Sequence, residues 1–89
     1  MKKCVLDGSR LAGAAEIYRE LAEAFGFPEY FGDNPDALWD ALGDYRGQPV
    51  TVIWRHAARS AHQFGPRFAE IVAVLQRAAA EGTLTLELA

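Results

Sequence analysis

Apolar residues follow two different periods along this chain, one typical of helices and one typical of strands. Between about residues 14 and 25, Ile17, Leu21 and Phe25 recur every four positions, which predicts an amphipathic helix that ends at Gly26. From 84 to 88, leucines alternate with polar residues, which is the period of a half-buried strand. Shorter apolar runs at 3–6 and 50–54, the second rich in β-branched residues, predict two further strands.

Three further helices complete the predicted order of elements. The first has the clearest start signal in the chain: Asn34 is a cap, Pro35 takes the first helical position and Asp36 lies in the positive first turn. We expect it to run to about residue 42 and to end at Gly43. A short helix at 56–63, and a longer one that starts after 65 and ends before Gly82, follow the second strand.

The resulting order, βααβααβ, defines the predicted fold. Strands that alternate with helices indicate a parallel sheet. At 89 residues the chain is below the size at which a second core is plausible, so we expect one domain over residues 1–89. The predicted fold class is α/β, a three-stranded parallel sheet packed with about four helices, in which 50–54 is a buried central strand.

The acidic residues are concentrated in the middle of the chain. The formal net charge is −3, from nine Lys and Arg against twelve Asp and Glu. Residues 29–44 carry a charge of −5, because they contain five acidic residues and no Lys or Arg. These acidic residues are Glu29, Asp33, Asp36, Asp40 and Asp44. The rest of the chain has nine basic and seven acidic residues, a charge of +2. This balance argues against direct binding of nucleic acid, which depends on clustered Lys and Arg.

Three of these carboxylates form a ridge on the helix predicted after Asn34. At 100° per residue, Asp40 lies about 40° from Asp36, and Asp44 lies about 80° from it if the helix extends that far; Trp39 flanks the stripe expected to face the core. That stripe consists of Ala37, Leu38, Ala41 and Leu42. Like charges four residues apart cost about 0.2–0.5 kcal/mol per pair, so folding alone would not select the ridge. The ridge is either a solvated acidic face or an anionic surface for a cationic partner.

Two adjacent aromatic residues, Tyr30 and Phe31, precede this helix in the loop at 28–34. Large rigid side chains bury much surface on binding at a low entropic cost, which favours a binding role. Either ring could instead fill the core between two helices. For Tyr30 the surface interpretation is favoured, because its hydroxyl requires water or a polar partner.

No set of residues suited to catalysis is evident. His56 and His62 are six residues apart, which is off the spacing that places two ligands on one helix face, and we expect both at the surface. Asp33, Asp36 and Asp40 could hold Mg²⁺ through carboxylates, but protein binding explains them better. We therefore expect a protein that is not an enzyme and that uses no metal or other cofactor.

The first residues and the single cysteine indicate the compartment. The apolar run at the start stops at Asp7, far short of a signal-peptide core or a membrane span. Cys4 has no cysteine partner, and its place in an apolar strand predicts a buried thiol. We expect a cytoplasmic protein that does not bind membranes.

The chain resembles the barstar family, the intracellular inhibitors of the ribonuclease barnase. The resemblance rests on residues 1–8 (MKKCVLDG), 28–34 (PEYFGDN) and 36–42 (DALWDAL), with weaker matches at 54–55 and 80–82. It implies a three-stranded parallel sheet packed by helices, with the second helix and the loop before it inserted into a ribonuclease active site. Asp40 would then take the place of a substrate phosphate.

The resemblance also implies a set of residues at or beside the contact. They are Tyr30, Phe31, Gly32, Asn34, Asp36, Trp39, Asp40, Gly43, Asp44, Tyr45 and Arg77. Some depart from the family pattern: Tyr45 matches a tryptophan, Asp44 a glycine, and Phe31 a second tyrosine. Arg77 matches a glutamate that pairs with the ribonuclease, which reverses the sign of the charge. Arg77 either pairs with Glu81 one turn on, or faces a cognate partner that differs from barnase there by presenting an acidic or neutral group.

These observations predict an inhibitor of a small secreted or toxin ribonuclease that protects the cell that makes it. The acidic helix and its preceding loop would block the active site of a barnase-like enzyme by mimicking RNA phosphate. The alternative is a binding module whose acidic helix docks on a different basic protein that is not a ribonuclease. We expect the free protein to be monomeric.

Overall fold

The computed structural model describes residues 2–28 and 32–89 and contains the predicted βααβααβ order. Its elements are β1 (Lys2–Asp7), α1 (Ala14–Phe25), α2 (Pro35–Asp44), β2 (Val50–Arg55), α3 (Ala57–Phe64), α4 (Pro66–Ala80) and β3 (Leu84–Leu88). This arrangement confirms the predicted α/β class. None of the helices in the described part of the chain is both long and apolar enough to cross a membrane.

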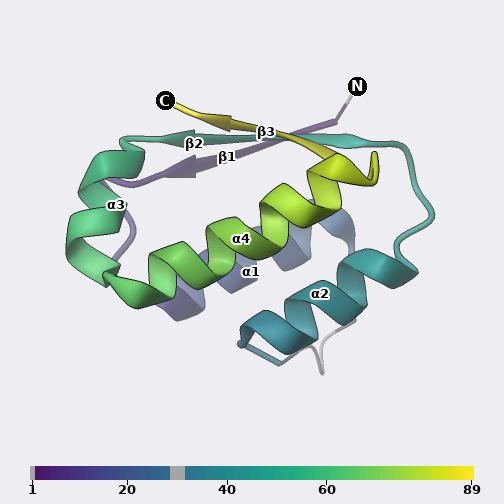
Figure 1. The fold of residues 1–89 in the computed structure, drawn as a ribbon, viewed down its shortest axis with the longest axis horizontal. Coiled ribbons are helices and arrows are strands. Elements are labelled where there is room, and N and C mark those ends of the chain that lie inside the picture. Colours follow the sequence, from purple (N-terminus) through teal and green to yellow (C-terminus); the bar gives the residue numbers. More distant parts are fainter. Residues whose placement is uncertain (1, 29–31) are drawn as a thin grey trace.

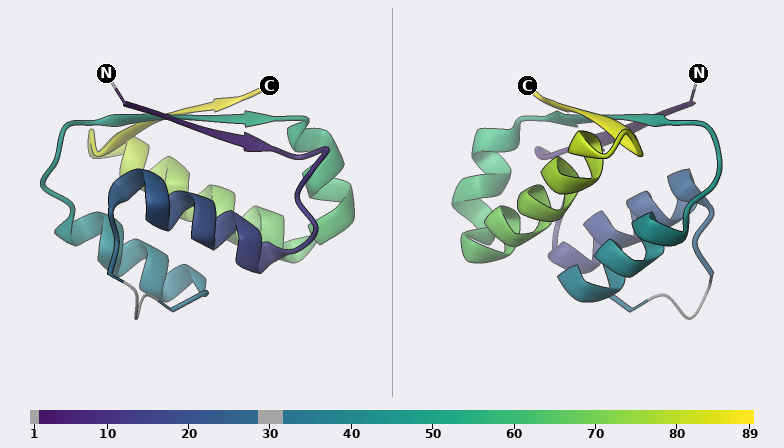
Figure 2. Two further views of the ribbon diagram at one scale, coloured as in Figure 1. Left: turned by 180° about the vertical axis from the view of Figure 1, so that it is seen from behind. Right: turned by 45° about the vertical axis from the view of Figure 1, so that its right-hand side comes forward.

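The three strands form one parallel sheet in the order β1-β2-β3, so the strand rich in β-branched residues lies in the centre as predicted. The four described helices lie on one side of this sheet (Figures 1 and 2). β2 was predicted to be a buried strand, and the structure buries it fully on its inner face only. Its inward residues Val50, Val52 and Trp54 are buried, but Thr51 and Ile53 on the other face are partly exposed.

The core lies between the inner face of the sheet and the helices. Its largest fully buried side chain is Trp54, which packs in one cluster with Leu6, Leu21 and Ile71. The indole Nε1 of Trp54 donates a hydrogen bond of 3.0 Å to the hydroxyl of Ser60, which is also fully buried. A polar group inside the core thus has its partner, which avoids the cost of about 1–3 kcal/mol for burying an unsatisfied donor.

Helix boundaries agree with the predictions at most ends, and the exception is the end of α2. Gly26 ends α1 in the left-handed region with φ +75°, as its glycine predicted. By contrast, α2 continues through Gly43 to Asp44. At this end the guanidinium Nη1 of Arg46 donates to the carbonyl of Gly43 at 2.7 Å, which satisfies a carbonyl of the last turn without a glycine cap.

Candidate protein-binding surface

The rotation of α2 about its axis is fixed by its first turn and by two leucines. The backbone N–H of Ala37 donates to the Oδ1 of Asn34 at 2.8 Å, and Pro35 takes the first helical position, as predicted. Leu38 and Leu42 are 0% and 1% exposed and anchor one side of the helix in the core. The opposite side must therefore face solvent.

That opposite side carries the acidic ridge, which consists of Asp36, Asp40 and Asp44. All three residues are exposed, in agreement with the helical phase predicted from the sequence. The positive end of the helix dipole stabilises the charge of Asp36 in the first turn, whereas the negative end destabilises the charge of Asp44 in the last turn. The Arg46 guanidinium, which also reaches the carbonyl of Tyr45 at 3.2 Å, places a positive charge beside this unfavourable end.

One flank of the ridge is covered by a contact between two helices. The guanidinium carbon of Arg77, on α4, lies 4.4 Å from the centroid of the Trp39 ring, on α2. This is cation–π geometry, typically worth about 0.5–1 kcal/mol at an exposed site. The charged group of Arg77 thus contacts Trp39, a contact that neither of its two predicted roles includes.

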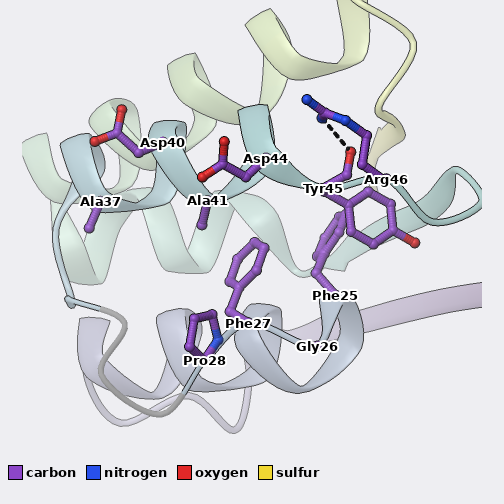
Figure 3. Close-up of a pocket in the computed structure, with 10 residues that line it drawn as sticks. All are labelled: Phe25, Gly26, Phe27, Pro28, Ala37, Asp40, Ala41, Asp44, Tyr45 and Arg46. Carbon is purple, nitrogen blue, oxygen red and sulfur yellow. Dashed lines mark hydrogen bonds between the residues drawn. The ribbon is translucent and has the colours of Figure 1, made fainter.

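The other flank of the ridge borders an open pocket of about 510 Å³ between α2 and the end of α1. Three aromatic rings line this pocket. The ring of Phe25 stacks on that of Phe27, with 5.5 Å between the centroids, and meets the ring of Tyr45 edge to face at 5.0 Å. In Figure 3, Ala37 and Ala41 point toward these rings, and the carboxylates of Asp40 and Asp44 lie beside the two alanines at the edge of the pocket. The ridge therefore runs between an aromatic pocket and the Trp39–Arg77 stack.

Comparison with known proteins gives this surface its context. The family model described as "Barstar (barnase inhibitor)" matches residues 1–87. The chain belongs to the barstar family. It is also similar to "Putative ribonuclease inhibitor YrdF" of Bacillus subtilis (strain 168), with 30% identity over 81 residues, or 91% of this chain and 89% of the relative. The resemblance read from the sequence is confirmed, and barstar-family membership supports ribonuclease inhibition as the general activity.

Most of the contact residues that the barstar resemblance implies gather around α2. Gly32 and Asn34 lie at its start, where the backbone N–H of Asn34 donates to the Gly32 carbonyl at 3.0 Å. Gly43 and Tyr45 lie at its end, and the Tyr45 hydroxyl donates to the carbonyl of Gln48 at 2.6 Å. Two predicted contact residues, Tyr30 and Phe31, lie outside the described residues.

Two features of this surface could not be found from the sequence. In the sequence, the pocket leaves no trace except two small residues beside the ridge, Ala37 and Ala41, which do not by themselves indicate a pocket. The stack of Arg77 on Trp39 has no sequence signal, because it joins residues on different helices.

The groups considered for metal binding or catalysis are separate from one another. Across residues 2–28 and 32–89, no three His, Cys, Asp or Glu side chains come together as a metal site. His56 and His62 are exposed, as predicted. Cys4 is 5% exposed, which confirms the buried thiol, and burial, with a smaller effect of the Glu20 charge, raises its pKa to about 11.

Proposed function

We propose that this chain inhibits a ribonuclease by placing the acidic ridge of α2 in the basic active-site cleft of the enzyme. The observation that carries the proposal is the ridge itself, three exposed carboxylates on one side of a helix whose other side is held by Leu38 and Leu42. Membership of a family described as the barnase inhibitor supplies the class of target.

A carboxylate can stand in for an RNA phosphate because both present charged oxygens to the Arg and Lys donors of a cleft. Asp40 is the central member of the ridge, with Asp36 one turn before it and Asp44 one turn after it. We assign it the position of the substrate phosphate. An inhibitor of this kind keeps RNA out by filling the site, so it requires no covalent step and no cofactor.

The remaining contacts are proposed to surround the ridge. Gly32 and Asn34 would meet the partner at the start of α2, and Gly43 and Tyr45 at its end, with Tyr30 and Phe31 adding aromatic contacts from the preceding loop. The charge of −5 over residues 29–44 would attract a basic cleft before contact. Because salt screens exposed charges over about 8 Å at physiological ionic strength, association should slow as salt is added. The inhibitor would act inside the cell that makes the ribonuclease.

The proposal is tested by removing one charge from the ridge without changing its shape. With barnase as the enzyme and a fluorogenic RNA as the substrate, we expect Asp40→Asn to raise the inhibition constant by about 10- to 150-fold, which corresponds to ~1.5–3 kcal/mol for a charged hydrogen bond. The matched control is Glu87→Gln, which removes the charge of an exposed glutamate on β3 and so has the same net charge as Asp40→Asn. It should inhibit within about twofold of the unmodified chain, since surface changes away from the contact cost little.

Three results would count against this mechanism. Equal inhibition by Asp40→Asn and by the unmodified chain would remove Asp40 from the contact. Equal losses for Asp40→Asn and Glu87→Gln would indicate a general effect of net charge. Salt-dependent binding to a basic protein without any effect on RNA cleavage would favour the alternative, an acidic-helix module for a partner that is not a ribonuclease.

A further inference from the structure

Two cations border the acidic ridge: Arg46 at the end of α2, and Arg77 against the Trp39 side of the helix. Arg77 is exposed on α4, and its guanidinium lies 4.4 Å from the ring centroid of Trp39, the residue that precedes Asp40 on α2. The two helices pack against each other, and Trp39 is partly buried against the core. The contact with the ring therefore favours this position of the positive charge over the other positions that a flexible arginine side chain can reach.

The stack leaves the hydrogen-bonding groups of the guanidinium available. The attraction between a guanidinium and a ring acts through the positive charge, so it requires none of the five N–H donors to make a conventional hydrogen bond. Among the residues that the structure describes, no acceptor receives a hydrogen bond from Arg77. These donors face water in the free protein, so a partner can reach them.

The surface is thus divided by charge within the width of one helix. Asp36, Asp40 and Asp44 require cations opposite them, whereas the flank at Trp39 requires an acceptor. A partner cation at this flank would find the Trp39 face already covered and would be repelled by the fixed charge. The other flank, at Ala37 and Ala41, borders the aromatic pocket, and the cation of that pocket, Arg46, lies at the end of the helix.

We propose that Arg77 determines specificity by selecting a ribonuclease that carries an Asp or Glu at the rim of its basic cleft, opposite the Trp39–Arg77 stack. This inference rests on the proposed function, because it assumes that the ridge faces the enzyme. It predicts a cognate enzyme with a mixed surface: cations in the cleft and one carboxylate beside it. Specificity then comes from repulsion of enzymes that are basic at both places.

A charge-reversal scan of barnase tests this inference. Each Lys and Arg at the rim of the barnase cleft is changed singly to Glu, and inhibition of every variant that still cleaves RNA is measured with the unmodified chain. We expect at least one reversal to strengthen inhibition by about tenfold or more, as a new charged hydrogen bond would. Arg77→Gln should abolish this gain, and Arg77→Glu should reverse it.

The matched control is Arg59→Gln, which removes one exposed arginine from α3 and leaves the same net charge as Arg77→Gln. It should keep the full gain. Thermal unfolding of Arg77→Gln and Arg59→Gln shows whether both variants are folded.

The inference is overturned if no reversal strengthens inhibition, or if the gain is the same with Arg77→Gln as without it. The Asp40→Asn variant separates this outcome from failure of the proposed function. If Asp40→Asn weakens inhibition of barnase but Arg77 shows no coupling to any rim charge, the ridge mechanism stands and the specificity role is wrong. If Asp40→Asn has no effect as well, both fail.

Discussion

The Oδ1 of Asn34 accepts a hydrogen bond of 2.8 Å from the backbone N–H of Ala37. This bond satisfies one of the N–H groups that have no partner inside the first turn of a helix. It also fixes the residue at which α2 begins. Because each residue adds a constant rotation, this start and the two buried leucines together set the direction in which Asp36, Asp40 and Asp44 point.

Replacement of Asn34 should therefore weaken the fold at the start of α2. We expect Asn34→Ala to lower the free energy of unfolding by about 1 kcal/mol, because the Ala37 N–H loses its acceptor. Asn34→Ser, which can still cap, should recover most of this loss. Urea unfolding of the free protein measures both variants without any contribution from binding. Equal stability of Asn34→Ala and the unmodified chain would show that the cap is not a stabilising contact.

Gly43 provides a test of the observed end of α2. It lies inside the helix, is exposed, and has open space where a Cβ would be added. Gly43→Ala should raise the free energy of unfolding by roughly 0.5–1 kcal/mol, because glycine is a poor residue inside a helix. Gly26→Ala has the same open space but a φ of +75°, so it should instead lower stability by about 1–2 kcal/mol. Two changes of the same sign in urea unfolding would contradict this assignment.

Cys4 should make stability depend on pH in the alkaline range. Burial raises its pKa from 9.0 to about 11, so above pH 9 the thiol ionises more readily in the unfolded chain than in the folded one. Its contribution to stability is complete below pH 9 and is lost as the pH rises toward 11. Urea unfolding of the unmodified chain and of Cys4→Ala over this range should show a steeper loss for the unmodified chain.

A second measurement follows from the same burial. At pH 8 an aromatic disulfide reagent should label the Cys4 thiol slowly in the folded protein and rapidly in urea, because the reactive species is the exposed thiolate. Parallel pH profiles for the two proteins, or rapid labelling of the folded protein, would show that the thiol is not shielded.

Local patterns in the sequence were sufficient to predict the helices and strands. They were insufficient for features that depend on residues outside the element concerned. The start of α2 was predictable because Asn34 and Pro35 act on the backbone beside them. Its end was not: α2 continues past Gly43 to Asp44, and Arg46, two residues beyond the helix, donates to the Gly43 carbonyl. The partly exposed outer face of β2 was not predicted, because β-branched residues indicate a strand but do not show which faces the helices cover.

The sequence by itself determined the phase of the acidic ridge, and the observed length of α2 adds Asp44 to it. The spacing of Asp36, Asp40 and Asp44 places them on one side of any helix that contains them, because the rotation per residue is a property of the backbone. The tertiary structure alone decided what lies on either side of the ridge. Arg77 reaches Trp39, and three aromatic rings border Ala37 and Ala41, because α1, α2 and α4 pack together. Such contacts depend on the packing of side chains between helices, which the periodicity of a single helix does not contain.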